Sequence, residues 1–184
     1  WLALNDPIMA LRQAILAESP EEVASLLVAQ GPALLASGAY ALLAQGLGLL
    51  GEPHISTRPE LVLLYGWVSH AQFQFDITAR VIQWIEAQLE APEWQRLTAE
   101  FATLRAQLAI NQGNAERAAP LAEQALAGPA RYLASTPLTA TAILSEARFV
   151  LGYLDESLQR VREVERLARQ REDHQLLLWS FCHQ

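Results

Sequence analysis

Six side chains have the chemistry to recognise a small polar ligand together. Aromatic rings offer flat apolar faces, and Arg and His offer directed hydrogen bonds, which is the combination found in sugar and small-effector sites. The six are Tyr65, Trp67, His70, Arg105, Arg148 and Trp179. Each lies where we expect the first helix of a helix pair, and these helices usually line the inner wall of a stacked array. The competing interpretation makes Trp67 and Trp179 ordinary core residues.

Catalysis and metal binding find little support in the sequence. The chain contains no Lys, so it lacks the Gly-rich loop ending in Lys that binds nucleotide phosphates. The four His residues are scattered, and Cys182 is the single Cys, so no metal-ligand spacing is present. We therefore expect a binding module rather than an enzyme, with no cofactor and no metal in this segment.

The charge balance argues against direct contact with nucleic acid. The net charge is −7, whereas binding to phosphates requires a basic surface. The one Arg-rich stretch, residues 160–171, has Glu163 and Glu165 interspersed. Such alternation is typical of a solvated helix face. DNA binding is expected only through another domain.

Residues 23–51 carry no charge and could suggest a membrane segment. Gly31-Pro32 and Ser37-Gly38 divide this stretch into pieces shorter than the roughly 20 residues that a spanning helix needs. We therefore predict two short core helices and no membrane span. The single Cys fits a reducing compartment, which favours the cytoplasm.

A helical unit recurs 39 positions apart and predicts the fold. The segments 110–118 and 149–157 are equivalent, and a weaker copy lies at 74–79. Such a period is typical of an all-α, TPR-like solenoid, a right-handed superhelix of antiparallel helix pairs. Its predicted turns contain Gly113, Asn114 and Gly152, because a left-handed residue closes a helix end. Small residues that let paired helices approach are predicted at Ala79, Ala118 and Ser157.

We predict a single segment over residues 1–184. Its parts are atypical N-terminal helices in 1–51, helix pairs at 59–91, 93–128 and 136–171, and the start of a further repeat at 173–184. Gly31-Pro32 should interrupt the second helix, residues 93–112 should form one long helix, and Pro120 should kink its helix. Both ends of the chain are expected to be cut from a larger protein.

Four segments lie in order along the chain: Arg58–Trp67, Ala99–Asn114, Glu165–Gln170 and Leu178–Ser180. They resemble the helical-repeat domain of MalT-type transcription activators, and the resemblance covers about residues 58–184. It implies a large, LuxR-type, ATP-dependent bacterial regulator with a nucleotide-binding module, a superhelical sensor and a C-terminal DNA-binding domain. In the best-known member, maltotriose and ATP drive self-association.

The resemblance gives this chain the role of a sensor. An oligosaccharide or other small effector, or another domain or subunit of the parent regulator, would bind its concave face. ATP would bind elsewhere in the parent protein. The alternative is a protein-interaction scaffold with no small ligand.

Overall fold

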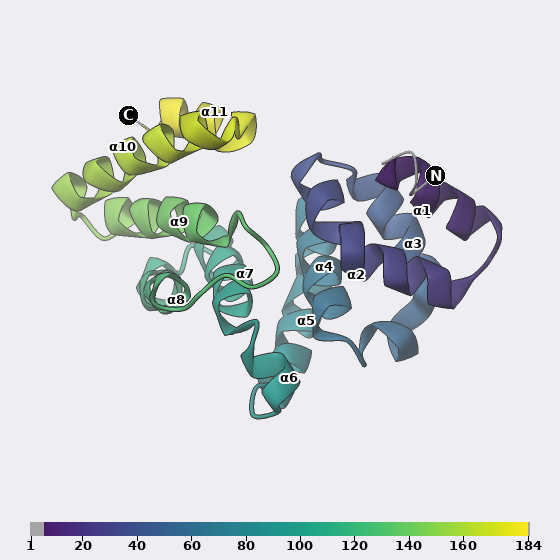
Figure 1. Ribbon diagram of the computed structural model, residues 1–184. Coiled ribbons are helices and arrows are strands. Elements are labelled where there is room, and N and C mark those ends of the chain that lie inside the picture. The colour runs from purple at the N-terminus through teal and green to yellow at the C-terminus, as the bar shows by residue number, and fades with distance from the viewer. Residues whose placement is uncertain (1–5, 184) are drawn as a thin grey trace. The chain divides into compact units, whose positions relative to one another are not determined.

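A computed structural model describes residues 6–183, and all of their regular secondary structure is helical (Figure 1). The predicted all-α helical-repeat class is confirmed, and the right-handed superhelical path stays a prediction. The outermost predicted bounds, at residues 1–5 and 184, lie outside the described residues. The helices are α1 (Pro7–Leu16), α2 (Pro20–Ala36), α3 (Tyr40–Ile55), α4 (Pro59–Ala71), α5 (Phe75–Gln88), α6 (Pro92–Gln95), α7 (Thr98–Asn111), α8 (Ala115–Ala127), α9 (Thr136–Val150), α10 (Leu154–Arg171) and α11 (His174–Cys182).

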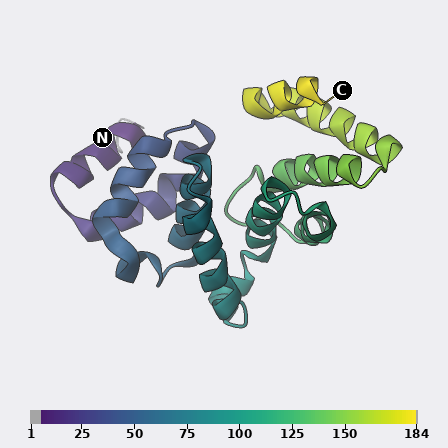
Figure 2. The same cartoon turned by 180° about the vertical axis from the view of Figure 1, so that it is seen from behind.

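The chain forms two compact units that meet in the sequence at Leu97 and Thr98. In the first unit α2 packs against α3, and α4 packs against α5. In the second unit α7 packs against α8, α8 against α9, and α9 against α10. Within α1 to α5 and within α7 to α11, helices that follow one another in the sequence are thus neighbours in space, as both ribbon views show (Figures 1 and 2).

The same backbone cap ends six of the helices. In each, a residue with positive φ follows the helix, and the next amide N–H reaches back five positions to a carbonyl oxygen. At Gly113, for example, φ is 74°, and the Asn114 N–H donates to the Ala109 oxygen at 2.9 Å. This hydrogen bond satisfies a carbonyl that would otherwise lack a partner at the helix end. The six residues are Glu18, Gly38, Phe73, Gly113, Gly152 and Glu172.

These caps correct the repeat register of the first full pair. Phe73 occupies the left-handed position with φ 60°, so the offset to Gly113 is 40 residues rather than 39. The buried small residue after the turn is therefore Thr78, which is fully buried, and not Ala79, which is half-buried. Thr78 is the counterpart of Ala118 and Ser157. A bulky aromatic residue in the left-handed position concealed this shift from sequence comparison.

A second repeated feature joins a Glu in the first helix of a pair to the connection that follows the pair. Glu60 in α4 accepts a hydrogen bond from the Arg96 guanidinium. Glu100 in α7, 40 positions later, is fully buried and accepts the backbone N–H groups of Arg131 and Tyr132 at 2.6 and 2.7 Å. The third pair has Thr139 at this position. The two Glu residues therefore anchor the segments that connect each helix pair to the next.

Two expectations about helix continuity were wrong. The predicted long helix over 93–112 is divided into α6 and α7, because Arg96 folds back, donating to the Glu93 carbonyl at 3.0 Å and pairing with Glu60. Helix α2 continues through Gly31-Pro32, since buried side chains on both sides hold it in the core. Pro120 lies inside α8, on its exposed side, and the kink expected there stays a prediction.

Within residues 6–183, none of the helices has the length and apolar character needed to cross a membrane.

Candidate functional site

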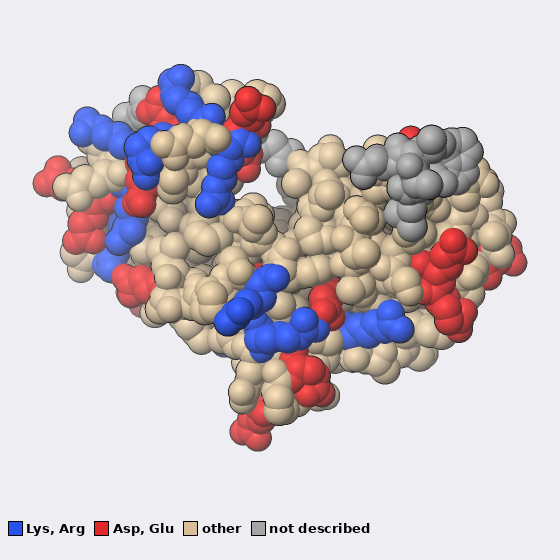
Figure 3. All heavy atoms as spheres, in the orientation of Figure 1, with Lys and Arg blue, Asp and Glu red and all other residues tan. Residues whose placement is uncertain are grey.

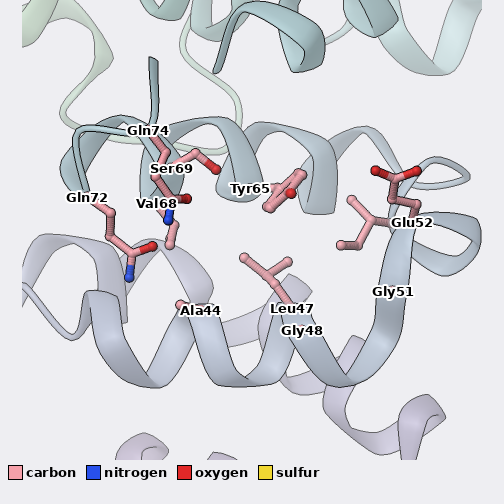
Figure 4. Close-up of a pocket in the computed structure, with 11 residues that line it drawn as sticks. Ala44, Leu47, Gly48, Gly51, Glu52, Tyr65, Val68, Ser69, Gln72 and Gln74 are labelled. Atoms are coloured by element: carbon pink, nitrogen blue, oxygen red, sulfur yellow. The ribbon is translucent and has the colours of Figure 1, made fainter. Parts of the chain in front are cut away.

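Two pockets adjoin at Tyr65 in the first unit. The first, which we call the apolar pocket, has a volume of about 230 Å³ and lies between α3 and α4 (Figure 4). Its floor is formed by small and aliphatic side chains of both helices. The lining residues are Ala44, Leu47, Gly48, Gly51, Glu52, Ile55, Tyr65, Val68, Ser69, Gln72 and Gln74.

Two glycines create the space in the apolar pocket. A Cβ atom added to Gly48 would meet no other atom within 4 Å, so the missing side chain leaves this part of the cleft open. Gly51 has φ 67° and ψ 167°, which ends the regular part of α3 and redirects the chain into one further turn. That turn brings Glu52 to the rim and buries Ile55, which is 2% exposed.

The second pocket, which we call the aromatic pocket, has a volume of about 240 Å³. Arg80, Gln83 and Trp84 come from one face of α5, because residues at i, i+3 and i+4 are neighbours on a helix. Tyr65 and Glu52 line this pocket as well as the apolar one, so the two are contiguous. Ile77 and Val81 complete the lining.

The two pockets differ in what they can bind. The aromatic pocket combines the indole of Trp84 with the planar polar groups of Arg80, Gln83 and Glu52. An indole face accepts the apolar face of a sugar ring, while guanidinium, amide and carboxylate groups can hydrogen-bond to its hydroxyls. The apolar pocket offers mainly aliphatic surface, with polar groups at its ends.

Tyr65 is the predicted ligand-binding residue that lines these pockets, whereas Trp67 and His70 form a separate ring cluster. Their rings meet edge to face with centroids 5.8 Å apart, and His70 lies 5.6 Å from the ring of Phe75. Burial in this cluster lowers the pKa of His70 below its ordinary value of 6.5, because desolvation disfavours the charged imidazolium. The Trp67 indole nitrogen is buried without a hydrogen-bond partner.

The other three predicted residues lie in the second unit. Arg148 of α9 pairs with Glu123 at 2.5 Å and with Glu156 at 3.4 Å, and its guanidinium lies over the Tyr153 ring. The caps lie 39 positions apart between α9 and α7 and 40 positions apart between α7 and α4, so the residue of α4 equivalent to Arg148 is Ser69.

Trp179 of α11 stacks on the His183 ring, with centroids 4.2 Å apart, and also packs on the cluster that contains Leu138 and Val164. This placement agrees with the interpretation of Trp179 as a packing residue. Arg105 lies half-buried in α7. When α4 and α7 are aligned by the residues that cap them, the residue of α4 equivalent to Arg105 is Tyr65, 40 positions earlier.

Sequence reasoning missed most of the aromatic pocket. Trp84 and Arg80 belong to the second helix of a pair, and the search considered only first helices. An available signal was the placement of Arg80 four positions before Trp84 on a helix whose buried residues include Val81, Ile82 and Ile85. On the face that Figure 3 shows, basic and acidic groups are interspersed over α9 to α11.

Within the described part of the chain, no group of three or more His, Cys, Asp and Glu residues is placed to hold a metal ion.

Comparison with known proteins identifies relatives over the whole chain. The chain is 31% identical over 187 positions to the HTH-type transcriptional regulator MalT of Vibrio cholerae. It is 30% identical to the proteins of that name in Yersinia pestis and Yersinia pseudotuberculosis. The chain is MalT-like.

The predicted resemblance is therefore confirmed, and it extends to residues before 58. All of the MalT-like chain is covered in these matches, but it spans only 21% of the length of the curated relatives. No protein-family model matches the chain.

Proposed function

We propose that this chain is the effector-sensing segment of a MalT-like bacterial transcription activator and that an oligosaccharide binds around Tyr65. The observation that carries the proposal is the shared position of Tyr65 between two contiguous pockets, one of which presents Trp84 with three planar polar side chains. The similarity to regulators named MalT supports the regulatory role. The parent protein would act in the cytoplasm, with ATP and DNA bound by its other domains.

The ligand would act by selecting one conformation of the regulator. An effector shifts a conformational equilibrium only by its difference in affinity for the two states. The aromatic pocket alone is lined by Glu52 of α3, Tyr65 of α4 and Trp84 of α5, so a sugar there contacts three elements at once. A change in the packing of α5 against α4 would alter the pockets and hence the affinity.

Titration calorimetry with a panel of oligosaccharides, including maltotriose, tests this proposal. Replacement of Trp84 by Leu keeps an apolar side chain but removes the flat indole face. We expect Trp84→Leu to weaken binding at least about tenfold, equivalent to about 1.4 kcal/mol. The matched control is Trp179→Leu, which alters a Trp outside the pockets and should leave the affinity unchanged. The absence of binding heat across the panel would reject an oligosaccharide effector.

The second candidate function is a protein-interaction scaffold, and the turn between α9 and α10 favours it. Phe149 and Leu154 are 63% and 60% exposed, whereas their counterparts Ile110 and Ala115 in the preceding pair are 6% and 4% exposed. Exposed apolar groups of this kind mark interaction sites. Under this hypothesis, the partner is another domain or subunit of the same regulator.

Sedimentation velocity of the intact regulator tests the scaffold. The double variant Phe149→Ser, Leu154→Ser should reduce subunit association if the turn is an interface. Unchanged association, together with sugar binding that depends on Trp84, would leave effector sensing as the function.

A further inference from the structure

The apolar pocket between α3 and α4 is poorly suited to a sugar ring. Its central surface comes from Ala44, Leu47, Ile55 and Val68, and Leu47, Ile55 and Val68 are each 2% exposed. These side chains cannot hydrogen-bond to sugar hydroxyls, and a hydroxylated ring placed there would lose its contacts with water. Apolar surface of this kind instead gains free energy by covering a hydrocarbon group.

The polar groups of the apolar pocket lie toward its ends. Figure 4 shows Gln72, Gln74 and Ser69 at one end and Glu52 at the other, with Tyr65 pointing toward Leu47 between them. Glu52 borders both pockets and places a carboxylate where they join. A ligand that spans this junction is therefore disfavoured when it carries a negative charge there, because an anionic group would meet the carboxylate.

We infer that the effector is amphiphilic: an oligosaccharide that carries an uncharged apolar substituent, such as an alkyl, acyl or aryl group. This inference rests on the proposed function, since the sugar occupies the aromatic pocket with a ring on Trp84. The apolar substituent passes Tyr65 and lies in the apolar pocket, where Gly48 leaves room. The amides of Gln72 and Gln74 hydrogen-bond to any polar group at the end of the substituent.

Gly48 provides a way to fill the apolar pocket without disturbing the core. It lies inside α3, its φ is not positive, and nothing stands within 4 Å of the Cβ position. The variant Gly48→Leu therefore adds a side chain to the open space, and Leu is a better helix former than Gly. Gln45→Leu is the matched control, because it adds the same side chain to an exposed position of the same helix.

The experiment compares an oligosaccharide that binds in the panel with its own n-octyl glycoside. Both are titrated below the concentration at which the glycoside forms micelles. We expect the octyl glycoside to bind the 184-residue chain at least about tenfold more tightly than the parent sugar. Burial of as few as two methylene groups suffices for that gain. Gly48→Leu should abolish the gain while leaving the affinity for the parent sugar unchanged, and Gln45→Leu should preserve both.

The outcomes separate this inference from the proposed function. If the parent sugar binds and the octyl chain adds no affinity, the amphiphilic ligand is rejected while sugar binding stands. A gain that persists unchanged in Gly48→Leu also rejects it, since the alkyl group then lies elsewhere. If neither the parent sugar nor its glycoside binds, both proposals are rejected.

Discussion

The two units of this chain are built from the same hairpins but have different cores. Most of the largest fully buried side chains belong to the first unit, including Leu11, Leu27, Leu43 and Leu64. The core between α7, α8 and α9 of the second unit is instead rich in alanine. Its buried alanines are Ala106, Ala109, Ala115, Ala118, Ala119, Ala122 and Ala147.

This difference shows where space for a ligand can arise in a helical repeat. Small side chains allow helices to pack closely and leave little room between them. Large side chains hold helices farther apart, and the gap is filled only where each position carries a side chain. Gly48 on α3 breaks that filling, and the apolar pocket results. The caps at the turns are the same in both units, so the pocket arises from the missing side chain at Gly48 and the change of direction at Gly51.

The largest expected effect distinguishes the two Glu residues that hold the connections. Glu100→Ala should lower the free energy of unfolding by about 3 kcal/mol, because the two backbone N–H groups of Arg131 and Tyr132 lose their buried acceptor. Glu60→Ala should cost about 1 kcal/mol or less, since its partner Arg96 has a half-exposed side chain. Urea denaturation of both variants measures the difference. Equal losses would show that the two residues do not differ in this way.

The next effect tests the corrected repeat register. Ala118→Leu should destabilise the second unit by about 2 kcal/mol, because Ala118 is fully buried between packed helices. Ala79→Leu, at the position that sequence spacing alone equates with it, should change stability by no more than about 0.5 kcal/mol. Thermal or urea unfolding gives both values. A large loss in Ala79→Leu would restore the 39-residue offset.

A smaller effect is expected from the left-handed cap residues. Gly113→Ala should cost about 1 kcal/mol, since a Cβ atom is unfavourable at φ 74°. Phe73→Gly removes that same penalty from the first unit but also loses the contact between the Phe73 and Phe75 rings. We therefore expect Phe73→Gly to be neutral or stabilising by less than about 1 kcal/mol. If Phe73→Gly is instead as destabilising as Gly113→Ala, the Phe73 ring contributes more to stability than the left-handed backbone conformation at that residue costs.

The smallest effect is a pH dependence confined to the first unit. Because the pKa of His70 is lowered in the folded state, the unfolded chain binds more protons as the pH falls through about 6.5. The contribution of His70 to stability is therefore complete above that pH and is lost as the pH falls below it. His70→Ile introduces the residue found at the equivalent position 110 and should flatten the dependence. Denaturation midpoints of wild type and variant at pH 5 to 8 measure it.

The sequence allowed the fold class and most helix ends to be predicted. Gly38, Gly113 and Gly152 identify turns because glycine adopts positive φ without strain. Glu18, Phe73 and Glu172 adopt the same conformation without any such signal. At these positions the packing of the flanking helices determines the backbone conformation, and it outweighs the unfavourable energy of a positive φ in a residue other than glycine.

Of the six predicted ligand-binding residues, Tyr65 alone lines the two pockets of the candidate site. The prediction assumed that ligand-binding side chains come from the first helices of the pairs. The pockets instead draw on the end of α3, on α4 and on α5. No periodicity could reveal this, since the site depends on a missing side chain at Gly48 and on a change of direction at Gly51.

The amino-acid sequence by itself determined that this protein is helical, that its helices pair through capped turns, and that it resembles MalT-type regulators. These features depend on the spacing of residues close together in the sequence, and in a repeat the same spacing recurs and can be recognised. Only the tertiary structure decided which glutamate is buried, which small residue follows each turn, and which helices enclose the pockets. Those features depend on contacts between residues far apart in the chain, where volume, burial and hydrogen-bond partners are set by packing.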